Sequence, residues 1–247
     1  MSKLKVSAVS YLNTRPFIRG MEQTGFVNEI DLSLDIPALC AAKLLDGRVD
    51  VGLVPVAVIP LLKEPHIITS FCIGADGPVR SVLLYSQVPM SEITEILLDN
   101  QSRTSVALVK ILASRLWNIN PKYTLASDGY EKQIRGTVAG VVIGDRTFGL
   151  NDAYKYRFDL AEGWKNLTGL PFVFACWVSN KPIDTATEAR FNRALERGVS
   201  QADQVAIEYV NKFPEGSELV QYLTQSLQYR LDDRKREGLK QFLSFLT

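Results

Sequence analysis

The sequence predicts an α/β fold with two lobes and a ligand cleft between them. Short apolar segments alternate with amphipathic ones over most of the chain, which is the pattern of strands and helices around a largely parallel sheet. Two unusually apolar segments, 81–86 and 172–179, bracket a central block with its own alternation. We therefore expect a discontinuous first lobe, residues 1–86 and 180–247, and an inserted second lobe, residues 87–179. A single doubly wound sheet would give a similar pattern and stays open as the alternative.

Strands are predicted where about four to eight apolar or alternating residues stand between turn residues. Such runs recur from the start of the chain to the segment before Pro182. In chain order, the predicted strands are 4–10, 31–36, 49–55, 67–74, 81–86, 96–99, 123–127, 139–144 and 172–179.

Helices are predicted where apolar residues recur at helical spacing. Pro16 suits the first turn of the first helix, where its missing N–H costs nothing. After Pro182 the pattern becomes helical to the end of the chain. In order, the predicted helices are 16–25, 37–47, 104–117, 162–169, 184–202, 203–213, 217–226 and 232–246.

The charge balance excludes several partners. Lys plus Arg is 28 and Asp plus Glu is 27 among 247 residues, so no field of one sign attracts nucleic acid or an anionic membrane. The N-terminus lacks the long apolar stretch of a signal peptide, and the longest apolar run, 51–62, is too short to span a membrane. We expect a soluble, cytoplasmic protein, and the sequence leaves open whether it is a monomer or a dimer.

The sequence lacks the residue patterns that hold metals and common cofactors. Cys40, Cys72 and Cys176 lie far apart in apolar surroundings, and we expect buried free thiols. His66 is the single histidine and is expected on a surface loop. Neither GxxxxGK[ST] nor GxGxxG is present. We expect no metal and no cofactor.

A hydroxyl-rich turn precedes the helix predicted at 104–117. Ser102, Thr104 and Ser105 stand there with Arg103, and the free N–H groups of a helix start attract anions. One hydroxyl is enough to cap a helix. Three hydroxyls and an arginine therefore favour a site for a carboxylate or a phosphate, with a plain N-cap as the alternative.

Other polar groups follow the ends of further predicted strands. A buried strand runs into Gly144, Asp145 and Arg146, and open α/β sheets bind ligands at such carboxyl ends. An Asp–Arg pair that fixes the turn explains these residues equally well. Pro55 should end the strand 49–55 and expose backbone N–H groups, although a core strand with an exit turn is the simpler explanation.

The first predicted strand also ends in polar side chains. Ser10, Asn13 and Arg15 lie in its turn into the first helix, where helix capping is the plain alternative to ligand binding. Ser81 begins the strand 81–86 after a glycine-containing loop. A serine in such a place has no specificity by itself.

Six stretches together identify a family. They are SYLNTRPF (10–17), PVRSVLLYS (78–86), SRTSVALVKIL (102–112), IGDRTF (143–148), 159–177 and 227–242. With them the sequence resembles the chorismate dehydratases of the futalosine route to menaquinone, relatives of the type II periplasmic-binding-protein fold. The stretches are spread from end to end, so the resemblance covers nearly the whole chain.

The resemblance implies the loss of water from chorismate to give 3-[(1-carboxyvinyl)oxy]benzoate. Asn13 and Ser81 are the expected catalytic contacts. The proton-abstracting base is either Asp145 or a carboxylate of the substrate itself, and we favour the substrate. The expected substrate-binding residues are Ser10, Arg15, Val54, Pro55, Val56, Ser102, Arg103, Thr104, Ser105 and Gly144.

Other functions compete with this interpretation. A solute-binding protein of the same fold predicts a signal peptide or lipobox, and an effector-binding module predicts a helix-turn-helix; neither is visible. The sister enzyme, which acts on cyclic dehypoxanthinyl futalosine, carries a catalytic histidine where this chain has Gly144. It also begins with an SPCPNDTF-like turn in place of SYLNTRPF. Both differences favour the dehydratases.

Overall fold

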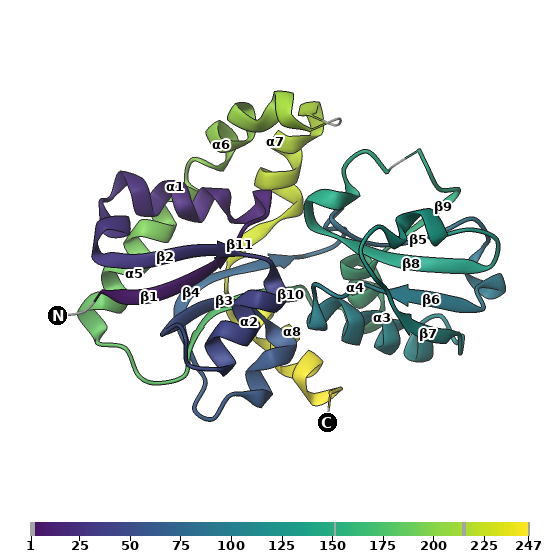
Figure 1. Ribbon diagram of the computed structural model, residues 1–247, viewed down its shortest axis with the longest axis horizontal. Helices are drawn as coiled ribbons and strands as arrows, with labels where there is room; N and C mark the ends of the chain where they lie inside the picture. Colours follow the sequence, from purple (N-terminus) through teal and green to yellow (C-terminus); the bar gives the residue numbers. More distant parts are fainter. Residues whose placement is uncertain (1–2, 151, 214–215, 247) are drawn as a thin grey trace.

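The computed structural model describes residues 3–150, 152–213 and 216–246, and the strands within these ranges form two separate sheets (Figure 1). The two sheets lie side by side with helices on their faces, so the alternative of a single doubly wound sheet is wrong. No helix in the described ranges is long and apolar enough to cross a membrane.

The first sheet has six strands in the order β11-β4-β10-β3-β1-β2. Strand β1 pairs in parallel with β2 and β3, whereas β10 is antiparallel to both β3 and β4. The strands are β1 (Leu4–Val9), β2 (Ile30–Asp35), β3 (Val51–Pro55), β4 (His66–Ala75), β10 (Phe172–Ser179) and β11 (Gln228–Arg230).

The second sheet has five strands in the order β7-β6-β8-β5-β9. Strand β6 is parallel to β7 and β8, and β5 is antiparallel to β8 and β9. The strands are β5 (Val82–Ser86), β6 (Glu95–Leu98), β7 (Lys122–Leu125), β8 (Val138–Ile143) and β9 (Tyr156–Asp159).

The helices cover the sheets and begin near the strand ends. The α-helices are α1 (Arg15–Gln23), α2 (Pro37–Leu45), α3 (Arg103–Arg115), α4 (Leu160–Thr168), α5 (Thr185–Val199), α6 (Ala202–Tyr209), α7 (Leu219–Gln221) and α8 (Asp233–Ser244). Short 3-10 turns that matter for the site are Leu12–Thr14, Val56–Leu61 and Gly144–Thr147, and a π-helical segment covers Tyr222–Ser226.

Helix α1 is held close to α5 by two glycines. A Cβ on Gly20 would lie 1.9 Å from the carbonyl oxygen of Ala194, and a Cβ on Gly198 would lie 1.8 Å from that of Pro16. Only glycine allows backbones to approach this closely. The contact fixes the start of α1, and with it the polar turn that follows β1.

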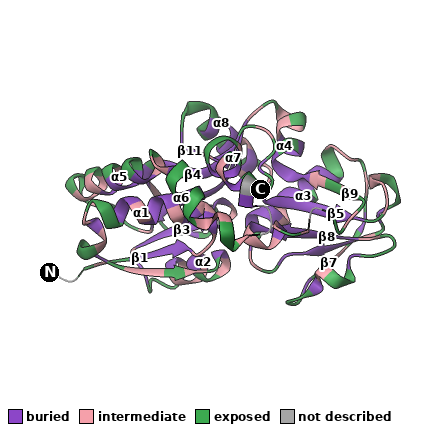
Figure 2. Ribbon diagram, turned by 90° about the horizontal axis from the view of Figure 1, so that it is seen from above, coloured by how far each residue is buried: buried purple, intermediate pink, exposed green. Residues whose placement is uncertain are grey.

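The apolar core is continuous through both sheets. One cluster of buried side chains includes residues of β1, β3 and β10 as well as β5, β6 and β8, and a smaller cluster covers the other face of the second sheet. Figure 2 shows buried residues along the strands of both sheets and exposed ones on the outer surface of α5. Cys40, Cys72 and Cys176 are buried free thiols, as predicted.

All nine predicted strands are present, and the described ranges contain two further strands that the sequence does not predict. Within the segment expected to be wholly helical after Pro182, Gln228–Arg230 forms β11, so that expectation is wrong there. Strand β5 lies in the second sheet and β10 in the first. The lobe boundaries at 86/87 and 179/180 stay a prediction. Sheet membership favours moving them to about residues 81 and 171, and residues 1–2 and 247 lie outside the described ranges.

Candidate active site

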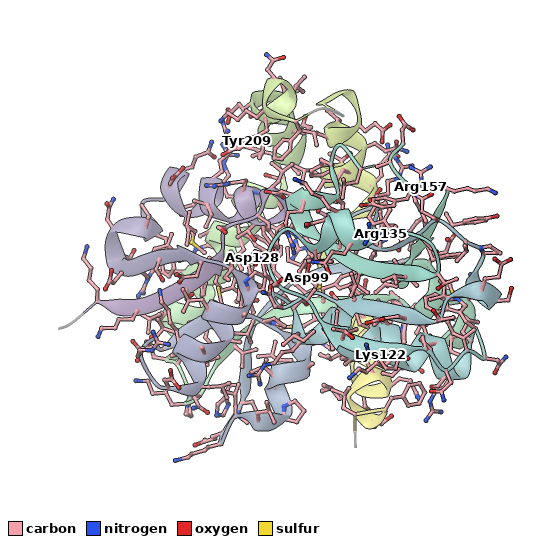
Figure 3. The ribbon with its side chains drawn as sticks, turned by 45° about the vertical axis from the view of Figure 1, so that its right-hand side comes forward. Asp99, Lys122, Asp128, Arg135, Arg157 and Tyr209 are labelled. Carbon is pink, nitrogen blue, oxygen red and sulfur yellow. The ribbon has the colours of Figure 1, made fainter. Side chains whose placement is uncertain are left out.

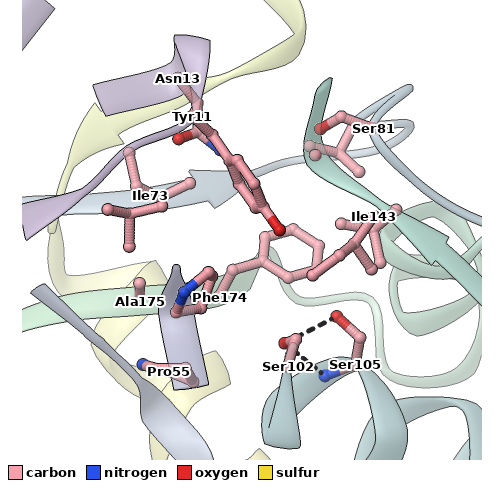
Figure 4. Close-up of a pocket in the computed structure, with 15 residues that line it drawn as sticks. Tyr11, Asn13, Pro55, Ile73, Ser81, Ser102, Ser105, Ile143, Phe174 and Ala175 are labelled. Atoms are coloured by element: carbon pink, nitrogen blue, oxygen red, sulfur yellow. Dashed lines mark hydrogen bonds between the residues drawn. The ribbon is translucent and has the colours of Figure 1, made fainter. Parts of the chain in front are cut away.

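A small cavity lies between the two sheets. Its volume is about 50 Å³, and its walls come from the ends of β1, β3 and β8, the start of β5 and the first turn of α3 (Figure 4). The carboxyl ends of parallel strands are the usual ligand site of open α/β sheets. The lining residues are Val9, Tyr11, Asn13, Pro37, Pro55, Ile73, Val79, Ser81, Val82, Ser102, Ser105, Ile143, Gly144, Phe174 and Ala175.

Polar groups face this otherwise apolar cavity from opposite sides. In Figure 4, Asn13 and Ser81 lie on one side and Ser102 and Ser105 on the other, with the rings of Tyr11 and Phe174 between them. The cavity therefore offers neutral hydrogen-bond donors in apolar surroundings. Such donors are stronger there than in water, because little solvent competes with them.

In the hydroxyl-rich turn, Ser102 and Ser105 line the cavity, whereas Thr104 makes a structural hydrogen bond. Ser102 caps α3 by accepting a hydrogen bond from the Ser105 N–H at 3.2 Å, and the two hydroxyl oxygens are 3.1 Å apart. Thr104 is buried and its hydroxyl accepts the N–H of Ala57 at 3.1 Å, which joins α3 to the turn after β3. Arg103 is exposed and does not line the cavity.

Ser81 is held firmly at the start of β5. Its carbonyl accepts the N–H of Gly144 at 2.8 Å, and its Oγ accepts the Tyr222 hydroxyl at 2.9 Å. The preceding residue, Arg80, has a left-handed φ of 66°, which is unfavourable for a side-chain-bearing residue. The carboxylate of Asp159 fixes this turn by accepting the Arg80 N–H at 2.7 Å.

Asn13 is oriented by its neighbour in the chain. The Thr14 hydroxyl donates to Asn13 Oδ1 at 3.1 Å, which leaves the amide N–H₂ of Asn13 available as a donor. Thr14 is buried at the N-cap position of α1, yet its side chain makes no capping hydrogen bond. Its hydroxyl therefore serves Asn13 instead of the helix.

Asp145 joins the two sheets instead of lining the cavity. Both of its carboxylate oxygens lie 3.0 Å from the Leu12 nitrogen and accept its N–H. The turn after β8 is thereby bonded to the turn after β1, and Asp145 does not line the cavity. Burial raises the pKa of Asp145 to about 6, against the opposing effects of the Leu12 N–H and Arg15. The expected Asp145–Arg146 pair is not what fixes the turn, because Arg146 pairs with Asp99 and Glu131.

The Asp99–Arg146 pair supports the turn that carries Ser102. Asp99 is buried after β6, near the middle of the molecule in Figure 3, whereas Lys122 lies at the outer side of the second sheet. The carboxylate of Asp99 accepts the Gln101 N–H at 2.7 Å and the Tyr130 hydroxyl at 2.9 Å. This ion pair, together with those bonds, holds the strand end in place.

Tyr11 closes one side of the cavity. Its hydroxyl donates to Gln101 Oε1 across the boundary between the sheets. Its ring lies against Gly144, whose φ of 61° and missing side chain make room for it. Burial raises the pKa of Tyr11 to about 12, so the phenol stays protonated. Tyr11 is not among the predicted catalytic or substrate-binding residues, because an aromatic residue beside a buried strand is normally a packing residue.

Among the remaining predicted binding residues, Ser10 and Arg15 do not line the cavity. Pro55 lines it, whereas Val54 and Val56 are buried beside it and do not. The Ser10 backbone N–H donates to the Asp35 carbonyl at 2.9 Å. Arg15 donates to the Ser10 carbonyl at 3.5 Å and its guanidinium lies over the Tyr209 ring.

The single histidine lies away from the cavity. His66 begins β4 instead of lying in a loop, and its ring nitrogen is 3.1 Å from the Glu64 carboxylate. Among the residues that the structure describes, no group of three or more His, Cys, Asp or Glu side chains is placed to hold a metal ion.

Comparison with known proteins identifies the family. A family model described as menaquinone biosynthesis matches residues 4–247. The chain belongs to the menaquinone biosynthesis family. A curated relative, the chorismate dehydratase of Thermus thermophilus, is 28% identical over 234 residues, covering 85% of this chain and 84% of the relative. The resemblance to the chorismate dehydratases is thereby confirmed.

Solved structures confirm the predicted fold for this member of the menaquinone biosynthesis family. A protein from Archaeoglobus fulgidus has a TM-score of 0.75 at 14% identity, covering 98% of this chain and 96% of that one. The Candida albicans CA3427 gene product, which has the generic periplasmic binding protein fold, has a TM-score of 0.62 at 11% identity, covering 100% of this chain and 90% of that one. These likenesses establish the two-lobe fold alone.

Proposed function

We propose that the protein is a chorismate dehydratase, which eliminates water from chorismate to give 3-[(1-carboxyvinyl)oxy]benzoate. The observation that carries the proposal is the cavity between the sheets, where Asn13 and Ser81 face Ser102 and Ser105 across apolar walls. Donors on both sides suit a substrate with two carboxylates. The relative from Thermus thermophilus, which is named a chorismate dehydratase, supports the same reaction.

The reaction depends more on how the substrate is positioned than on a strong acid. The C3–H electron pair becomes a ring double bond as the C4–O bond breaks, the departing hydroxide takes up a proton, and the ring becomes aromatic. Aromatisation provides the driving force. The site must hold both carboxylates, orient the C3 proton and the C4 hydroxyl, and exclude water.

The donors of the cavity match the charge that develops. The C3 hydrogen is vinylogously alpha to the ring carboxylate, so negative charge grows on that carboxylate as the proton leaves. Ser102 and Ser105, at the positive end of α3, would stabilise that charge. Asn13 and Ser81 would then contact the second carboxylate or the departing hydroxyl.

The base is assigned to the enolpyruvyl carboxylate of the substrate. Asp145, the alternative, lies outside the cavity lining, and both its oxygens face the Leu12 N–H. A carboxylate engaged between two turns is better suited to holding the sheets together than to taking up a proton from the substrate. An intramolecular base also has a high effective concentration.

The test is to incubate the purified protein with chorismate and to follow the aromatic enol ether by ultraviolet absorbance and mass spectrometry. We expect a product lighter than chorismate by one water, formed equally well with EDTA present. Unchanged chorismate would refute the reaction, and binding without turnover would indicate a carboxylate-binding protein instead.

Two substitutions distinguish the bases. Asn13→Ala should reduce kcat by at least about a hundredfold, which is typical of a lost oxyanion donor. Asp145→Asn keeps an oxygen for the Leu12 N–H and should reduce kcat far less. If the two variants lost kcat to the same extent, Asp145 would be favoured as the base and the substrate-assisted step would be contradicted.

A further inference from the structure

Tyr222 contacts both residues assigned to the chemistry although it lies outside the cavity lining. It is buried at the start of the π-helical segment Tyr222–Ser226, and its hydroxyl donates to Ser81 Oγ at 2.9 Å. The Asn13 side chain also lies near that hydroxyl, where its influence lowers the pKa of Tyr222 against the effect of burial. The ring is fixed by an edge contact with Phe148, with 5.4 Å between centroids.

The hydrogen bond from Tyr222 determines what Ser81 can offer to a ligand. A hydroxyl has one hydrogen to donate and two lone pairs that accept. Because Ser81 Oγ accepts from Tyr222, its own hydrogen is free to point into the cavity that Ser81 lines. Without this partner, the Ser81 hydroxyl would be free to rotate and to act as an acceptor toward the ligand.

The same hydroxyl determines the orientation of Asn13. Thr14 occupies Asn13 Oδ1, so a hydrogen bond from Asn13 to the phenol oxygen of Tyr222 would use one N–H of the amide. The second N–H remains for the cavity. An amide held at both ends cannot flip its oxygen toward the ligand, where it would repel a carboxylate or a departing hydroxide.

We propose that Tyr222 is a positioning residue, which together with Thr14 makes both Asn13 and Ser81 present hydrogen-bond donors to the substrate. The inference rests on the dehydration proposed above and assigns to it a residue that does not touch the substrate. Burial raises the pKa of Tyr222 strongly, so the phenol stays neutral and keeps the hydrogen that it donates to Ser81.

The experiment compares Tyr222→Phe with a matched control, Tyr229→Phe. Tyr229 is also buried, but its hydroxyl has no hydrogen-bond partner among the described residues. We expect Tyr222→Phe to lower kcat for chorismate about tenfold, the order expected for one lost hydrogen bond, with KM changed less than threefold. Tyr229→Phe should leave both parameters within twofold of wild type.

A double-mutant cycle separates positioning from general structural damage. If Tyr222 acts through Ser81, Tyr222→Phe should cost markedly less kcat in a Ser81→Ala background than in wild type. If the double variant lost kcat by the product of the two single losses, the proposal would be overturned. A Tyr222→Phe enzyme with wild-type kcat would overturn it as well. The pH profile of kcat should not change, because a neutral phenol transfers no proton.

A second variant tests the network without altering Tyr222. Thr14→Val is nearly isosteric and removes the hydroxyl that holds Asn13 Oδ1, so it should also lower kcat several-fold at nearly constant KM. Circular dichroism and Tm confirm that each variant is folded. Full activity of Thr14→Val would contradict the inference, whereas a wild-type protein that leaves chorismate unchanged would refute the proposed function and the inference with it.

Discussion

Gly144 allows the two sides of the cavity to approach each other. Its φ of 61° lies in the left-handed region, and a Cβ there would stand 2.5 Å from two carbons of the Tyr11 ring. Left-handed backbone costs residues with a side chain about 1–2 kcal/mol, and the overlap with Tyr11 adds to that cost. Gly144 is predicted to bind substrate; it lines the cavity and also lies against the Tyr11 ring that closes it.

We predict that Gly144→Ala reduces chorismate turnover at least about tenfold, because a displaced Tyr11 ring or a shifted turn disturbs a geometry that must hold within about 1 Å. Gly136→Ala is the matched control, since Gly136 has a similar φ of 57° with nothing within 4 Å of a Cβ. Both variants should lose about 1–2 kcal/mol of stability from the backbone alone. Equal turnover in the two variants would contradict a role for the Tyr11–Gly144 contact.

At the scale of residues, the sequence predicted the polar groups better than their partners. Asn13, Ser81, Ser102 and Ser105 were singled out because polar side chains in the turns at strand and helix ends are conspicuous. Tyr222 was not, because it lies 141 residues after Ser81 in an amphipathic segment where a tyrosine looks like core. A contact over that distance leaves no local signal.

The first turn of helix α3 both caps the helix and lines the cavity. The Ser102 side chain accepts the Ser105 N–H, as an N-cap does, and both hydroxyls line the cavity. The two interpretations offered by the sequence, N-cap and anion site, are therefore compatible. Thr104 adds a third role, because it accepts the Ala57 N–H from the turn after β3.

We predict that Ser102→Ala and Ser105→Ala have different effects on stability. Ser102→Ala should lower the free energy of unfolding by about 1 kcal/mol through loss of the cap, and should raise KM for chorismate. Ser105→Ala keeps the capped N–H and should raise KM at a smaller cost in stability. Urea unfolding and steady-state kinetics measure both quantities. The opposite order of stability losses would contradict the capping assignment.

Helices and most strands were predictable because their periodicity is strong. The two missed strands lack such a signal: β9 (Tyr156–Asp159) contains Arg157 and is mostly polar, and β11 has three residues within a segment that otherwise looks helical. Both are edge strands whose pairing depends on the neighbouring strand, β5 or β4. Tertiary context, not local sequence, forms them.

At the scale of the molecule, a few contacts hold the sheets together around the cavity. They include Leu12 with Asp145, Ala57 with Thr104, and Tyr11 with Gln101. A cavity of about 50 Å³ is far smaller than the roughly 300–1,000 Å³ of usual small-molecule sites. On the proposed function, chorismate would enter only with the sheets further apart near these contacts. The sequence predicted the two lobes but not their spacing, which depends on these pairs of distant residues.

The raised pKa of Asp145 predicts a pH dependence of stability. Its pKa is about 6 in the folded protein, above the value of about 3.9 in an unfolded chain, so the folded state binds more protons between these values. The contribution of Asp145 to stability should therefore fall as pH rises from about 4 to about 6. Asp145→Asn should remove part of that fall, as measured by urea unfolding at several pH values.

The control for this pH dependence is Asp31→Asn. Asp31 is exposed on the edge strand β2, so its substitution controls for the loss of one negative charge. Burial also raises the pKa of Asp159 to about 6. Its contribution to the pH dependence of stability has the same sign as that of Asp145 and is present in the wild type and in both variants. If the free energy of unfolding changed with pH in the same way in wild type and Asp145→Asn, the raised pKa of a buried Asp145 would be contradicted.

The central place of β10 has a consequence for synthesis of the chain on the ribosome. This strand lies between β3 and β4, yet it is made after the whole of the second sheet, which ends at Asp159. The second sheet can therefore pair all of its strands while β3 and β4 still expose unpaired backbone edges. During that interval the nascent first lobe is the part of the protein that is open to aggregation and in need of a chaperone.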